Sequence, residues 1–389
     1  MKLKPALAIM CVIISLLIWN HPGGADETKT IRIGATVSLE GPYREPSLMI
    51  QKAFRLWENE INQKGGLLGR KVELLLYNDK SQKELVRDLY RQLIVEDGVD
   101  FVFSPYGTPL TLVASEISEK HKMIMLACAA SGEVIWDRGH RYVFGVYALA
   151  NRYFIGLLDI MARDGHQTVS LIYNNASPFN VSVAQGVKKW ANRFKITVAH
   201  EKSYNDGSRE LAAAISDLKS AQAQRLIVSA YPPDCYRILN LMQDTNYQPQ
   251  ILGMTIAPIH PDFWKNAGKM AQGVFGPSQW EPSERIPFPG TKKFVQAFRL
   301  FTGKTPSYHA GSAYAACQLF EKAIIESHSL KNDDIRDYIA ASDTVTVIGR
   351  FKVDASGKQV GHNPILIQWQ NGKKEIVWPT KMQTAPPLM

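Results

Sequence analysis

Two loops that follow apolar runs carry the residue types with which proteins bind small anions. The first is Ser104-Pro105-Tyr106-Gly107-Thr108-Pro109, and the second is Ala129-Ala130-Ser131-Gly132. Gly107 lets a ligand approach the backbone, and Thr108 is a hydroxyl at an expected helix N-cap with proline behind it. Free amides and the positive end of the helix dipole favour an anionic group there. Ordinary helix capping explains either loop taken singly.

Side chains for catalysis or metal binding show no such grouping. The sequence has no GxSxG, HExxH or P-loop motif, and its nine histidines show no metal-ligand spacing. His309 begins an expected helix, where we expect a surface or capping role. The three cysteines beyond residue 25 form no CxxC pair and are interpreted as buried small hydrophobes: Cys128, Cys235 and Cys317. We therefore expect no enzyme activity, no metal and no cofactor.

The two loops belong to an alternation of strands and helices that predicts parallel sheets with crossover helices. The first series of expected strands is Ile31–Val37, Val72–Leu76, Val99–Phe103 and Met123–Ala127. The second series is Val169–Tyr173, Ile196–Val198, Leu226–Ser229 and Ile251–Thr255. Two such series predict an α/β protein of two doubly wound lobes.

Helix and turn signals complete this outline. Ser81-Gln82-Lys83-Glu84 has the spacing of a capping box that opens a helix, and a helix is expected from Pro109 to Lys120. Near the C-terminus, a strand is expected over Val345–Val353, and Asn371-Gly372 predicts a hairpin turn. The tail from Thr380 to Met389 is expected to be poorly ordered.

The N-terminus has the features of a secretory signal peptide. Lys2 and Lys4 precede an apolar run from Pro5 to Trp19, and small residues follow at Gly23 and Ala25. This run is shorter than the roughly 20 apolar residues of a membrane span. We expect cleavage after Ala25, so residues 1–25 are a signal peptide and the protein is exported to the periplasm; the alternative is an uncleaved anchor.

The charge of the chain gives little support to nucleic-acid binding. The formal net charge is +9 over 389 residues, and the basic residues are scattered without runs or interleaved aromatic residues. We expect no nucleic-acid partner and no second membrane segment.

At the two loops and beyond, the sequence resembles the periplasmic leucine/isoleucine/valine-binding proteins, the solute receptors of ABC importers. The resemblance covers about residues 30–385 and includes Ile31-Arg32-Ile33-Gly34, Gly65-Gly66-Leu67-Leu68-Gly69-Arg70, Asp79, Phe351-Lys352-Val353-Asp354 and Val377-Trp378-Pro379. It implies the type I periplasmic binding fold, in which three crossovers join two lobes around a central ligand cleft. Lobe one is then 30–146 plus 279–345, lobe two is 147–278 plus 346–380, and 381–389 is a tail.

The resemblance also implies the function and the partners. Hinge closure traps a small solute, and the closed receptor delivers it to an ABC transporter permease in the inner membrane. Receptors of this kind work as monomers, so a monomer is expected.

Several ligand contacts are implied residue by residue. Thr108 corresponds to a hydroxyl for the ligand carboxylate, Ala129 to a backbone carbonyl, and Ser131 to a backbone amide with a hydroxyl. Tyr231 corresponds to an aromatic residue that closes over the ligand, and Phe179 to a second one. Tyr106, which lies in the first loop, and Arg44, beside the first-loop region, are also predicted ligand contacts.

The position expected to hold the ligand ammonium departs from the family. Amino-acid binders have an acidic residue there, but this chain has Thr255. An ammonium without a carboxylate in a closed cleft has a large desolvation cost. We therefore interpret the ligand as a carboxylate or amide that is not a standard α-amino acid. Asp234 and Glu281 are the alternative acids.

Two other classes of function remain open. The domain could present its ligand to a signalling partner instead of a permease, in which case it is a sensor. An enzyme on the same scaffold would need a nucleophile in the cleft. Cys128 is the reactive side chain nearest to the expected cleft, and its apolar neighbours predict an inert thiol.

Overall fold

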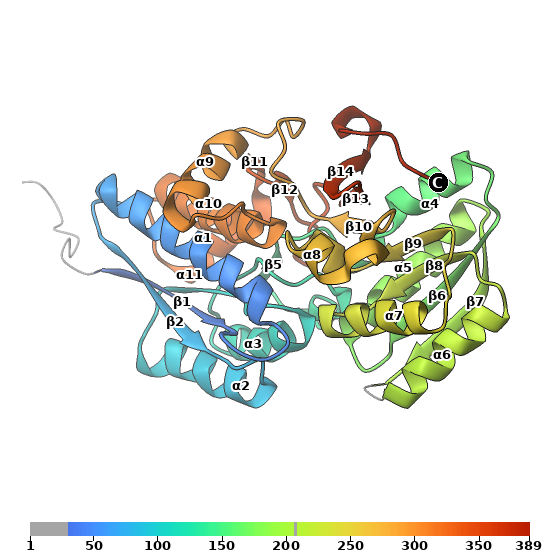
Figure 1. Ribbon diagram of the computed structural model, residues 1–389. Coiled ribbons are helices and arrows are strands. Elements are labelled where there is room, and N and C mark those ends of the chain that lie inside the picture. Colours follow the sequence, from blue (N-terminus) through green and yellow to red (C-terminus); the bar gives the residue numbers. More distant parts are fainter. Residues whose placement is uncertain (1–29, 206–207) are drawn as a thin grey trace, which may run out of the picture.

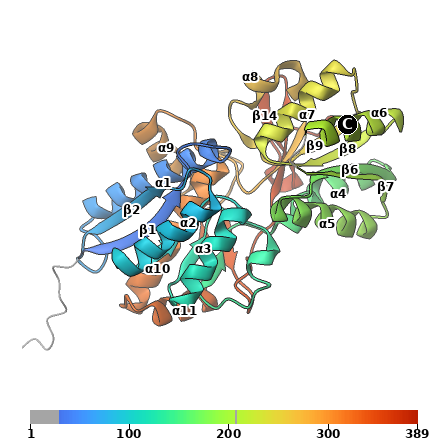
Figure 2. The same cartoon turned by 90° about the horizontal axis from the view of Figure 1, so that it is seen from below.

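The computed structural model describes residues 30–205 and 208–389, so the predicted signal peptide lies outside the described residues. The described chain folds into two α/β lobes that lie side by side (Figure 1 and Figure 2). None of the helices in residues 30–205 and 208–389 has the length and apolar character that a membrane span requires.

Lobe one is built on a five-stranded parallel sheet with the order β2-β1-β3-β4-β5. Its strands are β1 Ile31–Val37, β2 Val72–Asn78, β3 Phe101–Phe103, β4 Met125–Ala127 and β5 Val143–Gly145, and the last three are fully buried apolar runs. The helices of this lobe are α1 Arg44–Gln63, α2 Lys83–Arg91, α3 Thr108–Lys120, α9 Thr291–Thr302, α10 Tyr308–Ser327 and α11 Asn332–Ala341. Because β3 and β4 are neighbouring parallel strands, the loops that follow them lie at the same edge of the sheet.

Lobe two contains a seven-stranded sheet with the order β14-β13-β10-β9-β8-β6-β7. Its parallel strands are β6 Thr168–Asn174, β7 Thr197–Tyr204, β8 Arg225–Ser229, β9 Ile251–Met254 and β10 Phe275–Ser278. They repeat the strand order of lobe one. Its helices are α4 Ile155–Arg163, α5 Pro178–Arg193, α6 Ser208–Ser220, α7 Pro232–Asp244 and α8 Phe263–Ala267.

The C-terminal hairpin extends the second sheet. β13 (Ile365–Gln370) pairs antiparallel with β10 and with β14 (Lys373–Trp378). Asn371 and Gly372 both have positive φ, at 51° and 79°, as the predicted type I′ turn requires. The two predicted doubly wound lobes are thus confirmed, with two antiparallel strands added to lobe two.

The predicted division of the chain into two lobes stays a proposal. The assignment of each strand to one of the two large sheets supports it. β1–β5 form one sheet, and β6–β10 with β13 and β14 form the other. A third, two-stranded sheet joins β11 (Asp343–Thr346) to β12 (Gly349–Lys352), so it straddles the proposed boundary at residues 345 and 346. The strand expected over Val345–Val353 is therefore wrong as a single element, because the chain turns at Val347 and Ile348.

Two other local predictions are wrong. The capping box at Ser81 does not form, since α2 begins at Lys83 and its N-cap is Gln82 without a side-chain cap. Ser81 Oγ instead donates to Glu40 O at 2.8 Å. The tail is ordered: the backbone N–H of Leu388 donates to Gln368 Oε1 at 2.8 Å, and Thr384 N donates to Ile376 O at 2.9 Å.

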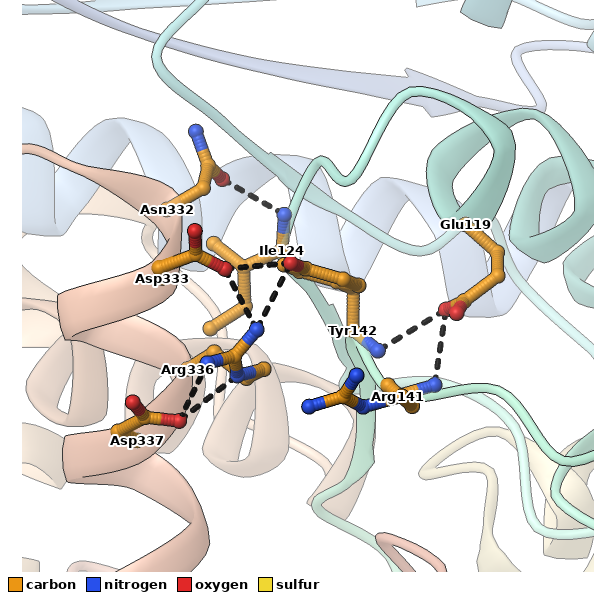
Figure 3. Close-up of polar contacts among 8 residues, drawn as sticks. All are labelled: Glu119, Ile124, Arg141, Tyr142, Asn332, Asp333, Arg336 and Asp337. Carbon is orange, nitrogen blue, oxygen red and sulfur yellow. Dashed lines mark hydrogen bonds and ion pairs between the residues drawn. The ribbon is translucent and has the colours of Figure 1, made fainter.

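A polar cluster attaches α11 to the edge of the lobe-one sheet (Figure 3). Asn332 Oδ1 accepts from Ile124 N at 2.7 Å, and Asn332 Nδ2 donates to Asp100 O at 3.1 Å. Arg336 Nη1 donates to Tyr142 OH at 2.7 Å and lies 2.5 Å from Asp333 Oδ1, which also accepts from the Tyr142 hydroxyl. This hydrogen bond from Tyr142 lowers the pKa of Asp333.

Candidate ligand-binding site

A pocket between the lobes is formed by loops that follow the carboxyl ends of strands in both sheets. This is the position at which open α/β sheets bind ligands. The lining residues are Tyr106, Gly107, Thr108, Ala129, Ala130, Ser131, Tyr147, Tyr153, Phe179, Tyr231, Ile256 and Tyr308. No acidic or basic side chain is among them. Six of the eight predicted contact residues are brought together here: Thr108, Ala129, Ser131, Tyr231, Phe179 and Tyr106.

In lobe one, the two hydroxyl-bearing loops hold one another in place. Gly107 N donates to Ala129 O at 2.9 Å, and Gly132 N donates to Thr108 Oγ1 at 3.0 Å. A Cβ on Gly132 would lie 2.7 Å from Thr108 Cγ2, so this approach requires glycine. The N-cap of α3 is Gly107 with φ 85°, and Thr108 is the first helical residue, so the predicted cap is wrong by one position.

The hydroxyl groups and the N-terminus of α3 make this side of the pocket suitable for an anion. Thr108 and Leu110 amides stand in the first turn, where the helix offers them no carbonyl partner, and Pro109 has no N–H. Ser131 Oγ lies 3.0 Å from Tyr153 OH. These neutral donors and the helix dipole stabilise negative charge without a cation.

Tyrosines from both lobes form most of the remaining wall. Burial raises the pKa of Tyr106, Tyr147, Tyr231 and Tyr308 well above its usual value, and raises that of Tyr153 to about 12. The phenols are therefore neutral at physiological pH and act as hydrogen-bonding groups on an aromatic surface.

Gln279 orients one of these phenols. Its Nε2 donates to Tyr153 OH and to Ala148 O, both at 3.1 Å, while its Oε1 accepts from Ala148 N at 2.8 Å. Gln279 is 3% exposed, so these contacts are shielded from water. The Gln279–Tyr153–Ser131 chain thereby joins the segment after β10 to the loop after β4.

Aromatic contacts across the cleft bring the lobes together. The ring centroid of Tyr231 lies 5.1 Å from that of Tyr43 and 6.5 Å from that of Tyr106. Phe179 contacts Tyr231 and Tyr153, each at 5.5 Å. The free space that remains is about 10 Å³, about that of a single water. A solute therefore enters only when the lobes separate or the rings move.

Thr255 does not line the pocket, which corrects its predicted role. Its side chain is fully buried, donating to Ala230 O at 2.6 Å and accepting from Ala230 N at 2.9 Å. The next residue, Ile256, faces the pocket instead and has φ 54°, a strained value for a β-branched residue. The residue presented from this loop is therefore apolar.

The other charged candidates are also directed elsewhere. Arg44 is exposed and donates from Nε to Leu39 O at 3.1 Å, so its predicted place in the site is wrong. Asp234 Oδ2 accepts from Tyr204 OH at 2.9 Å, and its Oδ1 pairs with Arg237 at 2.9 Å. Glu281 pairs with Lys374 at 2.7 Å. Neither acid lines the pocket between the lobes.

Two further side chains near the site are inert. Burial raises the pKa of the Cys128 thiol to about 12, and the free cysteines Cys128, Cys235 and Cys317 are all buried, as expected. His309 is 5% exposed rather than on the surface, which corrects the prediction, and burial lowers its pKa to about 3. Across the described chain, no three His, Cys, Asp or Glu side chains gather as metal ligands would.

Three tyrosines that line the pocket were not predicted from the sequence: Tyr147, Tyr153 and Tyr308. None of them directly follows a strand that the sequence predicts. Tyr147 follows β5, which was not predicted, and Tyr153 lies in the connection before α4. Tyr308 begins α10 and is stacked on His309 at 4.0 Å, although the sequence drew attention only to the histidine. Tyrosine at a helix start is too common to be a signal by itself.

Comparisons with known proteins agree with this geometry. The sequence model of one family, described as periplasmic binding protein, matches residues 30–374. A curated relative, a Leu/Ile/Val-binding protein homolog from Brucella suis, is 22% identical, and the alignment covers 94% of this chain and 95% of the relative.

Two solved structures share the fold. The substrate-binding protein of a branched-chain amino acid transporter from Streptococcus pneumoniae, in complex with isoleucine, has a TM-score of 0.81 at 21% identity, covering 90% of this chain and 100% of that one. A solute-binding protein of an ABC transporter from R. palustris, in complex with benzoate, has a TM-score of 0.76 at 17% identity, covering 90% and 96%.

Proposed function

Because the chain belongs to the periplasmic binding protein family, we propose that it is a solute receptor that closes on a small organic carboxylate lacking an α-ammonium group. The observation that carries the proposal is the pocket lining, which offers hydroxyls, phenols and a helix N-terminus but no carboxylate. A bound α-ammonium would be buried without a partner, at a cost of several kcal/mol.

The aromatic walls favour a flat or branched apolar body on this carboxylate. Tyr231 and Phe179 supply ring faces from lobe two, and Tyr106 and Tyr308 supply them from lobe one. Both ligand types are known among proteins of this fold, since one solved neighbour holds isoleucine and another holds benzoate. The absence of an acidic residue from the lining favours the second type.

We propose that the receptor acts in the periplasm after removal of residues 1–25 and delivers its solute to the permease of an ABC importer. The names of the relatives support this role, because they describe amino-acid-binding proteins and substrate-binding components of transporters. The receptor performs no chemistry on the solute. The inert Cys128 and the neutral phenols support this part of the proposal.

Thermal unfolding across a ligand panel tests the proposal. A ligand that binds only the folded state stabilises it by RT ln(1 + [L]/Kd), about 3 kcal/mol at a concentration of 100 Kd. Benzoate, 4-hydroxybenzoate and branched aliphatic carboxylates are expected to raise Tm, while leucine, isoleucine and valine at equal concentration leave it unchanged. A Tm increase confined to the amino acids would contradict the proposed ligand class.

A further inference from the structure

A second, larger cavity lies beside the crossovers that join the lobes, and we call it the hinge cavity. Its volume is about 390 Å³, within the range of small-molecule sites. Its lining residues are Gln279, Trp280, Ile286, Phe288, Ile348, Arg350, Gly361, His362, Asn363, Pro364, Ile365, Trp378, Pro379, Lys381 and Met382. None of these residues lines the pocket between the lobes.

The walls of the hinge cavity come from segments that connect the two lobes. Gln279 and Trp280 follow β10 where the chain leaves the lobe-two sheet, and Gly361 to Pro364 precede β13 where it returns. Arg350 belongs to β12, and Met382 lies beyond β14. Any rotation of one lobe against the other therefore changes the shape of this cavity.

The cavity combines an apolar floor with a lysine, Lys381, at its rim. Trp280, Met382 and Ile365 are buried among its apolar residues. Arg350 and Lys381 are the charged lining residues; Asp343 accepts from Arg350 Nε and Nη2 at 2.6 Å each and compensates its charge, so Lys381 is the cation that the rim offers to a ligand. No carboxylate lines the cavity. This distribution is complementary to an anion with a flat apolar body.

Two polar atoms of the lining side chains have no hydrogen-bond partner within the described chain: Trp280 Nε1 and His362 Nε2. His362 Nδ1 lies 3.1 Å from Arg350 O, and because a carbonyl only accepts, Nδ1 carries the proton. Burial lowers the pKa of His362 to about 4, so Nε2 is a free acceptor at neutral pH. Buried polar atoms of this kind are satisfied by ordered water, an ion or another bound species.

Gln279 connects the hinge cavity to the cleft. It lines the cavity, and its Nε2 donates to Tyr153 OH, which lines the pocket between the lobes. An occupant of the hinge cavity therefore contacts the residue that orients Tyr153.

We propose that the hinge cavity is a second ligand site, for a small organic anion with a flat apolar body. The site is spatially separate from the pocket between the lobes, since the two share no lining residue. Its position on the connecting segments makes it a place from which a bound anion acts on lobe closure, through its contacts with Gln279 and the crossovers.

Fluorescence titration with 1-anilinonaphthalene-8-sulfonate tests this site directly in the full-length mature protein. This probe is an organic anion with a flat apolar body and one N–H donor. Asn363→Trp places a ring at the exposed edge of the cavity, and Lys381→Glu reverses a charge at its rim. Lys373→Glu is the matched control, because Lys373 is an exposed lysine on β14 that does not line the cavity.

We expect one probe to bind per wild-type chain, with affinity about tenfold weaker in Lys381→Glu, lost in Asn363→Trp and unchanged in Lys373→Glu. Each variant must retain the wild-type Tm, which separates loss of the site from loss of the fold. Affinity that is equal in all four proteins would overturn the proposal. Loss of probe binding in the cleft variant Tyr231→Ala, with no effect of the hinge variants, would assign the probe to the cleft and also overturn it.

Discussion

Ile256 is the pocket residue on which the proposed ligand class depends most. Its side chain faces the pocket from the loop after β9, beside the buried Thr255 to which sequence reasoning gave this role. The resemblance pointed to the loop after β9, and this loop reaches the pocket through Ile256, whose backbone has φ 54°. An apolar side chain at this point leaves a ligand ammonium without a partner.

Ile256→Glu is expected to create amino-acid binding. The new carboxylate would face the pocket, and glutamate, which lacks a branched Cβ, tolerates the positive φ better than isoleucine does. Leucine affinity should rise at least about tenfold, while benzoate affinity falls because two carboxylates would repel each other. Calorimetric titration of both ligands measures the change. Ile256→Gln has the same shape without the charge and should not gain leucine binding; an equal gain in both variants would contradict the electrostatic explanation.

His309 is expected to make folding stability depend on pH. Burial is the largest cause of its lowered pKa, and the nearby charges of His260 and Lys374 add to the effect. Since the folded-state pKa is about 3 and the usual pKa of histidine is 6.5, the unfolded chain binds the proton first on acidification. Stability is therefore fully present above about pH 6.5 and decreases as pH falls towards 3, by up to about 1.4 kcal/mol per pH unit.

Urea unfolding of wild type and His309→Phe at pH 7 and pH 5 measures this effect. Wild type should lose more stability between these values than the variant, whose buried ring does not titrate. The control is His121→Phe, which changes an exposed histidine and should keep the wild-type pH dependence. Parallel pH curves for wild type and His309→Phe would show that His309 is not the cause.

At the scale of elements, most strands and helices could be predicted from apolar patterning, but three features could not. β5 has only three residues, too few for a periodic pattern, and the Tyr147 that follows it was missed with it. The residues from Ser81 have the spacing of a capping box, but Ser81 does not cap the helix because its Oγ donates to Glu40 O instead. The tail contains prolines and polar residues, and its order depends on hydrogen bonds to residues of β13 and β14, which a local sequence pattern does not reveal.

Gln368 is the residue that holds the tail, so Gln368→Leu is expected to destabilise the protein. Its side chain is fully buried in β13, donates to Leu388 O at 2.7 Å and Gly273 O at 3.0 Å, and accepts from Leu388 N at 2.8 Å. Removal of the Gln368 amide leaves these backbone groups unpaired, and the free energy of unfolding should fall by about 2–3 kcal/mol. Urea denaturation measures the loss. Gln224→Leu, at an exposed position, should have little effect, and equal losses would refute the role of Gln368.

At the scale of the whole molecule, the two lobes repeat one strand order and place their loops against each other. The closed arrangement is held by contacts that cross the cleft, such as Tyr43 with Tyr231 and the pair of Glu45 with His260 at 3.3 Å. With about 10 Å³ free in the pocket, solute entry requires a more open molecule. The type I fold could be predicted because the resemblance extends over nearly the whole chain.

Small-angle X-ray scattering is expected to detect this opening. The solute-free protein should have a larger radius of gyration than the closed structure, and saturating ligand should reduce it to the closed value. Tyr231→Ala removes a ring from the contact across the cleft and should favour the open form at a given ligand concentration. A solute-free protein that matches the closed structure, with no change on ligand addition, would argue against closure as the capture step.

We propose that the pocket accepts a carboxylate and rejects an α-ammonium group. Isothermal titration with leucine and with 4-methylpentanoate tests it most directly, because these two molecules differ only in the amino group. The pocket lining predicts that 4-methylpentanoate binds at least about 100-fold more tightly, corresponding to roughly 3 kcal/mol for an unpaired buried charge. Equal affinity for the two, or tighter binding of leucine, would contradict the account.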